Sequence, residues 1–135
     1  MELIESLNEA LIYVERNLFN EADSEGAARH VGLSRFYLER TFASLTGMSI
    51  SEYIRARRLS LAAQELLTGD VKVIDLAFKY GYDTPESFTK AFSRFHGVTP
   101  TSARRMCTLL RCQNPLAISL KMEGAVMMNY KIEQM

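Results

Sequence analysis

The chain has 135 residues, of which 47% are apolar and 24% are charged, a composition typical of ordinary globular proteins. No stretch approaches the roughly 18 consecutive apolar residues that a membrane span requires. The first residues also lack the basic leader and apolar core of a secretory signal. We therefore expect one compact domain with a short appendage, located in the cytoplasm, and no membrane partner.

The net charge is zero, with 16 basic and 16 acidic residues, but the charges are unevenly distributed. Residues 1–33 contain seven acids and two bases, residues 34–105 contain eleven bases and seven acids, and residues 106–135 contain three bases and two acids. An acidic flank of net charge −5 therefore precedes a basic block of net charge +4. A nucleic-acid binder is usually basic overall, so this pattern permits an anionic partner without establishing one.

The N-terminal third of the chain predicts three helices. Apolar residues between Leu3 and Leu18 recur at spacings of three and four, which indicates an amphipathic helix. Asp23 with the serine after it is a helix start signal, and Gly32 stops the short helix that follows. Ser34 is the expected N-cap of a third helix, which glycine 47 ends.

The longest helix is expected next, and a second set of short helices follows it. Ser49 or Ser51 opens the long helix, which runs to Leu67 and spans about 25 Å. Further helices are predicted, each with its own start or stop signal: residues 74–80 before Gly81, a helix from Thr84–Pro85 to Gly97, and a short helix from Thr99–Pro100 to Met106.

A duplication underlies this order of helices. Five residues of the first unit have counterparts fifty positions later: Ser34 and Thr84, Leu38 and Phe88, Arg40 and Lys90, Phe42 and Phe92, Gly47 and Gly97. Two copies are too few for a stacked repeat array. A duplicated helix, glycine turn and helix is instead what a DNA reader with two helix-turn-helix units requires.

The sequence changes in character after Cys112. Asn114–Pro115 breaks the helix, and residues 117–121 and 129–133 form short extended segments around Gly124. This tail is expected to be β-like or irregular, and either to pack on the helical domain or to begin a further domain. The expected divisions are a first helix-turn-helix subdomain, a linker helix, a second helix-turn-helix subdomain and the tail: residues 1–48, 49–69, 70–112 and 113–135.

The overall expectation is an all-α fold of about seven helices, with two helix-turn-helix subdomains joined by a long linker helix. Cys107 and Cys112 supply too few ligands for a structural zinc site, and we expect both thiols to be reduced. His30 and His96 have no metal or catalytic partner in the pattern and are expected to have structural or surface roles. We predict no cofactor, no metal and no catalytic residue.

These residues resemble a known family. The first unit and linker helix are similar to the AraC/XylS family at Gly32, Ser34, Leu38, Phe42, Gly47, Tyr53, Ile54, Arg58, Leu59 and Ala62. The second unit resembles that family's second signature at residues 75–82 and at Phe88, Phe92, Gly97, Val98, Thr99, Pro100 and Arg104. The resemblance covers about residues 3–106. It implies a seven-helix transcription regulator that inserts two helices into the major groove of double-stranded DNA.

The resemblance also implies partners other than DNA. It favours an activator that contacts RNA polymerase. The tail from Pro115 through residues 128–132 is similar to the join into a GyrI-like effector-binding domain. That similarity implies that a small-molecule effector would act only through a missing C-terminal domain of a longer regulator.

The second helix of the first unit carries the sharper set of candidate base contacts. Its expected outer face presents Arg35, Phe36, Glu39 and Arg40. An arginine such as Arg40 offers a fork to guanine, a glutamate accepts from the cytosine amine, and a phenylalanine contacts the thymine methyl. The alternatives are that the charged residues form a plain solvated face and that Phe36 packs against a neighbouring helix.

The corresponding helix of the second unit is expected to recognise DNA sequence less specifically. Its candidate base contacts are Pro85, Glu86, Thr89 and Lys90. The family commonly has arginine where Lys90 stands, and a lysine lacks the fork that arginine offers to guanine. Glu86 repels phosphates unless it meets a cytosine amine, so this helix is expected to anchor the protein more than to read sequence.

Phosphate contacts are expected from a further group of polar and basic residues, which position a protein on DNA without specifying sequence. They are Ser34, Arg55, Arg57, Thr84, Ser87, Arg94 and Arg104. Each of them could instead be a plain surface residue.

Two other functional classes are alternatives to a DNA-binding regulator. Net neutrality favours a helical protein-interaction module that does not bind DNA, whereas the duplicated units with polar outer faces argue against it. An enzyme is disfavoured because the sequence shows no nucleophile with its base, no metal cluster and no phosphate loop.

Overall fold

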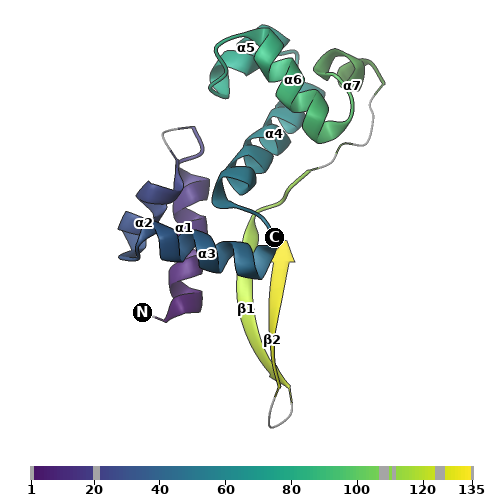
Figure 1. The fold of residues 1–135 in the computed structure, drawn as a ribbon. Helices are drawn as coiled ribbons and strands as arrows, with labels where there is room; N and C mark the ends of the chain where they lie inside the picture. Colours follow the sequence, from purple (N-terminus) through teal and green to yellow (C-terminus); the bar gives the residue numbers. More distant parts are fainter. Residues whose placement is uncertain (1, 20–21, 107–109, 111, 124–126, 135) are drawn as a thin grey trace. The chain divides into compact units, whose positions relative to one another are not determined.

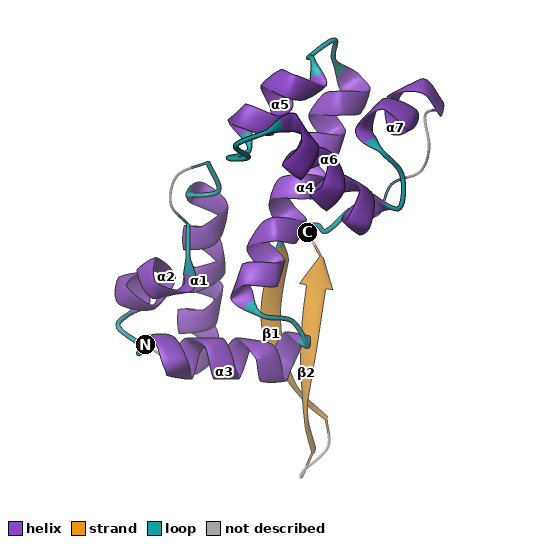
Figure 2. Ribbon diagram, turned by 45° about the horizontal axis from the view of Figure 1, so that its top comes forward, coloured by secondary structure: helices purple, strands orange, loops and turns teal. Residues whose placement is uncertain are grey.

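The computed structural model describes residues 2–19, 22–106, 110, 112–123 and 127–134. Within them the chain forms seven helices followed by a β-hairpin (Figure 2), which confirms the all-α prediction with a β-like tail. The elements are α1 Leu3–Arg16, α2 Ser24–Val31, α3 Arg35–Thr46, α4 Ile50–Thr68, α5 Val73–Lys79, α6 Pro85–His96, α7 Pro100–Met106, β1 Leu116–Glu123 and β2 Met127–Gln134. None of the described helices is long and apolar enough to cross a membrane.

These elements belong to two compact units, coloured along the chain in Figure 1. The first unit combines Met1–Ile54 with Asn114–Met135, and the second is Arg55–Gln113. The long helix α4 begins in the first unit and continues through the second. The C-terminal hairpin therefore belongs with the N-terminal helices, although it follows the second unit in sequence.

The core of the first unit is built from the apolar stripes of its helices. The stripe of α1 supplies Leu7 and Val14, at 0% and 2% exposure, and α3 supplies Leu38 and Phe42, also at 0% and 2%. Tyr53 of α4 closes this core, with its ring centroid 5.8 Å from that of Phe42. The helical periodicity in the sequence thus predicted which side of each helix is buried.

Local signals set the turn between α2 and α3. Gly32 has a φ of 74°, in the left-handed region where a side chain is strained, and it ends α2. The hydroxyl of Ser34 accepts a 3.1 Å hydrogen bond from the backbone amide of Tyr37, which caps the start of α3. These two local features end α2, start α3 and so set the turn between them.

The hairpin is attached to the first unit by specific hydrogen bonds. The amide group of Asn8 donates to the backbone oxygen of Ile118 at 2.9 Å and accepts from its backbone nitrogen at 2.8 Å. The backbone nitrogen of Leu116 donates to the hydroxyl of Tyr53 at 3.0 Å. The side chains of Leu116 and Ile118 are buried, at 9% and 3% exposure. Strand β1 therefore completes the core of the first unit.

Replacing Asn8 with alanine is expected to loosen this attachment. The change removes the side-chain partners of the backbone N–H and C=O of Ile118, and leaving buried polar groups unpaired costs about 1–3 kcal/mol. Hydrogen exchange at the Ile118 amide should become faster, while exchange in the second unit should not change. Asn17→Ala, on the segment just after α1, is the matched control. Unchanged protection of Ile118 would show that β1 is held without Asn8.

The second unit has its own core between α4, α5, α6 and α7. Leu66, Leu76, Phe88 and Phe92 are all at 0% exposure in this cluster. His96 is also buried, and its Nε2 lies 3.0 Å from the backbone oxygen of Leu59. The prediction of a structural or surface role for His96 agrees with this buried position.

An acid on α4 ties α5 to this core. Both the ammonium group of Lys79 and the hydroxyl of Tyr80 donate hydrogen bonds to the carboxylate of Glu65. Burial alone would raise the pKa of Glu65, but these two bonds lower it. Burial and the bond to Glu65 both raise the pKa of Tyr80, so Tyr80 stays protonated as the donor.

The thiol of Cys112 is free and exposed. Cys107, the other cysteine that we expected to be reduced, lies outside the described residues.

Candidate nucleic-acid interface

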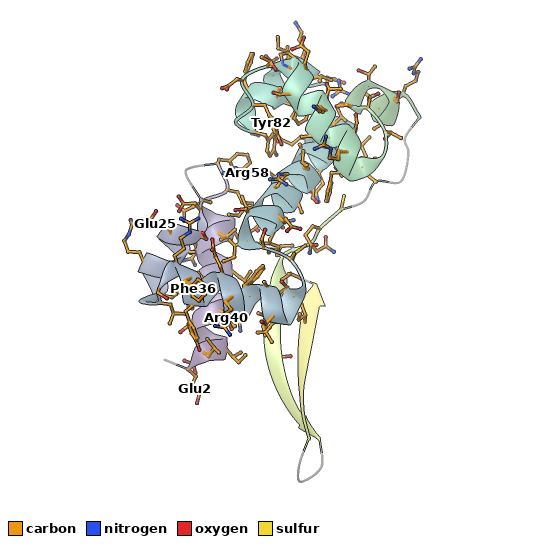
Figure 3. All side chains as sticks on the ribbon, viewed as in Figure 1. Glu2, Glu25, Phe36, Arg40, Arg58 and Tyr82 are labelled. Carbon is orange, nitrogen blue, oxygen red and sulfur yellow. The ribbon has the colours of Figure 1, made fainter. Side chains whose placement is uncertain are left out.

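The outer face of α3 is open to solvent along its length. Leu38 and Phe42 point into the core, whereas Phe36 is 72% exposed. Arg35 and Arg40 are exposed as well. Figure 3 shows Phe36 and Arg40 extending from the same side of α3. Among the described residues Arg40 has no hydrogen bond and no ion pair, so its guanidinium group is available to an external partner.

Arg40 lies in a hollow of about 440 Å³ at the start of α1. Leu3 and Ile4 form one wall of this hollow, and α3 supplies the other from Tyr37 to Leu45, including Ser44. Ser44 is exposed and stands four residues after Arg40, on the same face. Sequence reasoning missed Ser44, although its i+4 spacing from Arg40 is the signal that could have found it.

The carboxylate of Glu39 is held by hydrogen bonds from two neighbouring side chains. Its Oε1 accepts a 2.5 Å hydrogen bond from the hydroxyl of Ser24 and a 3.2 Å hydrogen bond from Nε of Arg35. The bond from Ser24, followed by that from Arg35, lowers the pKa of Glu39. Ser24 begins α2 and is 4% exposed. Glu39 therefore links the two helices of the turn, and only its second oxygen remains for a base.

Acidification is expected to weaken this link. Because the pKa of Glu39 lies below its ordinary value of 4.5 in the folded protein, its contribution to stability is complete above pH 4.5. That contribution is lost as the pH falls through the lowered pKa. We expect Glu39→Gln to be less stable than the parent at pH 7 and the difference to shrink towards pH 3 in urea unfolding. A constant difference would contradict this account; Glu25→Gln is the control.

The outer face of α6 carries fewer basic groups near the start of the helix than the outer face of α3 does. Phe88 and Phe92 are buried, while Glu86 and Lys90 are exposed and Thr89 is half-buried. Pro85 occupies the first helical turn and is half-buried. Glu86 and Lys90 lie four residues apart on the exposed side. An acid and a base thus take the positions that Phe36 and Arg40 have on α3.

The exposed phosphate candidates cluster at helix starts and on outer faces. Ser34 and Thr84 are N-caps, and the hydroxyl of Thr84 accepts a 3.1 Å hydrogen bond from the backbone amide of Ser87. Backbone amides and hydroxyls at a helix start form a favourable environment for phosphate. Further exposed candidates are Ser87 and Arg94 on α6 and Arg55 on α4.

Arg57 contradicts the phosphate prediction. It is 4% exposed, and its Nη1 donates a 2.6 Å hydrogen bond to the backbone oxygen of Gln113. Arg57 stands four residues after Tyr53 and three before Ser60, both of which are buried. Because Arg57 lies on the buried face of α4, its side chain is buried despite its charge. Its hydrogen bond to Gln113 anchors the end of the second unit.

Arg104 also serves the framework. Its Nε donates a 3.1 Å hydrogen bond to the backbone oxygen of Leu66, and its Nη2 donates a 2.5 Å hydrogen bond to that of Val71. A cation at the C-terminal turn of a helix pairs with unsatisfied carbonyl groups there. Arg104 therefore joins α7 to the end of α4, and we withdraw it from the phosphate set.

A different arginine of α4 is more accessible. Arg58 is half-buried and lies beside Tyr82 (Figure 3). Burial raises the pKa of Tyr82, and the positive charges of Arg55 and Arg58 oppose this rise. The pair Arg55 and Arg58 thus forms a basic site in the second unit, which the alternation of buried and exposed positions along α4 could have indicated.

The described side chains contain no group of three or more histidine, cysteine, aspartate or glutamate residues that could hold a metal ion. Each of the two units therefore has a helix with a capped start and an exposed outer face, together with exposed basic side chains.

Comparison with known proteins identifies the family. Residues 27–106 match the family model described as a helix-turn-helix domain. The chain belongs to this family. The AraC/XylS resemblance is confirmed, because a solved transcriptional regulator from Chromobacterium violaceum with an AraC-type DNA-binding domain has the same fold. It is 26% identical at a TM-score of 0.71, covering 76% of this chain and 91% of that one.

The chain is also similar in sequence to curated proteins and to a solved DNA complex. AarP, an HTH-type transcriptional activator of Providencia stuartii, is 40% identical over 98 residues, 73% of each chain. The right origin-binding protein of Escherichia coli K12 is 35% identical over 99 residues, 73% of this chain but 34% of that protein. The DNA-binding domain of AdpA, solved with a target DNA, is 28% identical at a TM-score of 0.67, covering 75% of this chain and 91% of that one.

The helix-turn-helix family match also divides the chain. Both α3 and α6 lie within residues 27–106, whereas α1 and the hairpin lie outside the matched range. The helices of the candidate interface are therefore part of the matched region, whereas α1 and the hairpin, which belong to the same compact unit as α3, are not.

Proposed function

We propose that this chain is a sequence-specific DNA-binding transcription activator, in which α3 and α6 each enter the major groove. The observation that carries the proposal is the open face of α3, where Phe36 is 72% exposed and Arg40 is unpaired among the described residues. The name of AarP as a transcriptional activator and the DNA complex of AdpA support it. An arginine fork on an exposed helix face is suited to guanine.

The two helices have unequal roles in this proposal. The base-contacting set in the first unit is Arg35, Phe36 and Arg40, with Ser44 added and Glu39 in a positioning role. In the second unit, Lys90 lacks the fork of an arginine and Glu86 repels phosphate, so α6 reads sequence weakly and anchors mainly through its capped start and Arg94. Phosphate contacts come from Ser34, Arg55, Arg58, Thr84, Ser87 and Arg94.

We propose further that the protein acts in the cytoplasm on nucleoid DNA and that an activator of this kind contacts RNA polymerase. A small-molecule effector that acts through a GyrI-like domain is part of the proposal only for a longer protein. The divisions at residues 48, 69 and 112 remain proposals for functional subdomains.

Selection from a randomised duplex library tests this function with the full chain. We expect enrichment of a site with two conserved segments. The segment whose conservation disappears when the selection is repeated with Arg40→Ala should be the more strongly conserved of the two. Binding to the selected site should weaken steeply as salt rises, because phosphate contacts release counterions. Absence of any enriched site, together with salt-independent or absent binding, would instead support the protein-interaction module.

A further inference from the structure

One hydrogen bond joins a buried residue of α2 to the outer face of α3. The hydroxyl of Ser24 donates to Oε1 of Glu39 at 2.5 Å. Ser24 is 4% exposed and is the first residue of α2. The start of α2 is fixed in turn, because the carboxylate of Asp23 accepts a 2.7 Å hydrogen bond from the backbone amide of Gly26. Ser24 is therefore a firmly placed donor that is itself too buried to contact DNA.

This bond restrains Glu39 more strongly than its ion pair with Arg35 does. The second donor to Oε1 is Nε of Arg35, at 3.2 Å. The side chains of Arg35 and Glu39 are 62% and 40% exposed, and an exposed pair four residues apart on a helix contributes little. A hydrogen bond from a buried hydroxyl to a carboxylate is stronger, because few water molecules compete for it. Ser24 is therefore the group that fixes the carboxylate.

Both bonds end on the same oxygen, so the second oxygen of Glu39 is left for an external donor. Among the described residues no donor bonds to Oε2. A carboxylate only accepts hydrogen bonds, and in the major groove only cytosine and adenine present an amino group. Guanine and thymine present acceptors, and adenine has an acceptor beside its amino group, so cytosine suits a carboxylate best. A fixed Oε2 discriminates between these bases, whereas a mobile carboxylate turns away from a wrong base at little cost.

We infer that Ser24, from outside the interface, sets the preference of α3 for cytosine at the base that Glu39 meets. This role of Ser24 rests on the proposed function and extends the positioning role of Glu39 within it. Ser24 holds Oε1, and Oε2 accepts from the amino group of the base. Without the hydroxyl of Ser24, the carboxylate is held only by Arg35 and moves with that exposed side chain. DNA binding then persists, and discrimination at one base pair is lost.

Selection from the randomised duplex library, repeated with Glu39→Ala, identifies the base pair that Glu39 meets. Fluorescence anisotropy on the selected site and on variants of that base pair then measures discrimination in Ser24→Ala. We expect a loss of about five-fold at this position, the lower end of the range for a base contact. The preference at the position lost with Arg40→Ala should remain. In the Glu39→Ala background, Ser24→Ala should remove no further discrimination, because the two residues act through one contact.

A matched control separates this role from general stability. Ser6→Ala makes the same change on α1, in the same compact unit and at the same exposure of 4%, and should leave discrimination unchanged. Carbon-13 nuclear magnetic resonance of the Glu39 carboxyl group measures the restraint without DNA. The bond from Ser24 is the largest cause of the lowered pKa of Glu39, so this pKa should rise in Ser24→Ala and stay in place in Ser6→Ala.

The outcomes distinguish the role of Ser24 from the proposed function. If the parent chain enriches no site, the proposed function fails together with this role. If the parent enriches a site, the role of Ser24 alone is wrong when Ser24→Ala keeps its discrimination or when Glu39→Ala changes the preference at no base pair. A loss spread evenly over the site would show that Ser24 only stabilises the fold. An unchanged pKa of Glu39 in Ser24→Ala would contradict the restraint itself.

Discussion

Replacing Arg40 with alanine is expected to weaken binding to the selected DNA site by about 1–3 kcal/mol. The guanidinium group of Arg40 is exposed on α3, and no described residue pairs with it. In the proposed contact with guanine, its loss removes two hydrogen bonds to the base edge, so the preference at one base pair should flatten. Fluorescence anisotropy on the selected site, on single-base variants of it and on random duplex measures both effects.

The matched variants for Arg40 distinguish base reading from simple attraction. Arg40→Lys keeps the positive charge but loses the planar fork, so it should retain most binding to random DNA and still lose discrimination. Arg105→Ala removes an exposed arginine of α7 that we assign to no contact, and it should change binding little. An equal loss of affinity on random and selected DNA in Arg40→Ala would show that Arg40 contributes only charge.

The helices of this protein could be predicted from sequence because their signals are local. Ser34 and Thr84 cap the starts of α3 and α6, and Gly47 and Gly97 end these helices with φ values of 76° and 83°. Each of these features depends on neighbouring residues alone. The buried faces could also be predicted, because apolar residues at helical spacing form one stripe that faces the core.

The errors came from contacts that join distant parts of the chain. Arg57 was predicted from its charge to face phosphate, but it donates to Gln113, 56 residues away. The bond from Ser24 to Glu39 and the pairing of Asn8 with Ile118 are likewise tertiary, with separations of 15 and 110 residues. Local patterns contain no information on such partners, so a charged or polar residue is assigned to solvent by default.

Two phenylalanines on α3 provide the second large expected effect. Phe42 is 2% exposed and packs beside Tyr53, whereas Phe36 is 72% exposed. Phe42→Ala should lower the free energy of unfolding of the first unit by about 3–5 kcal/mol, because it removes buried apolar surface and leaves a cavity. Phe36→Ala should change that free energy by less than about 0.5 kcal/mol.

The same two variants resolve the open alternative for Phe36. Urea unfolding followed by circular dichroism, with hydrogen exchange of the α3 amides, measures stability, and anisotropy on the selected site measures affinity. If Phe36 contacts a base, Phe36→Ala weakens binding to that site while the unfolding curve stays in place. A large loss of stability in Phe36→Ala would mean that its ring packs against another helix in solution. Unchanged affinity with unchanged stability would remove Phe36 from the interface and leave Arg40 as the main reader on α3.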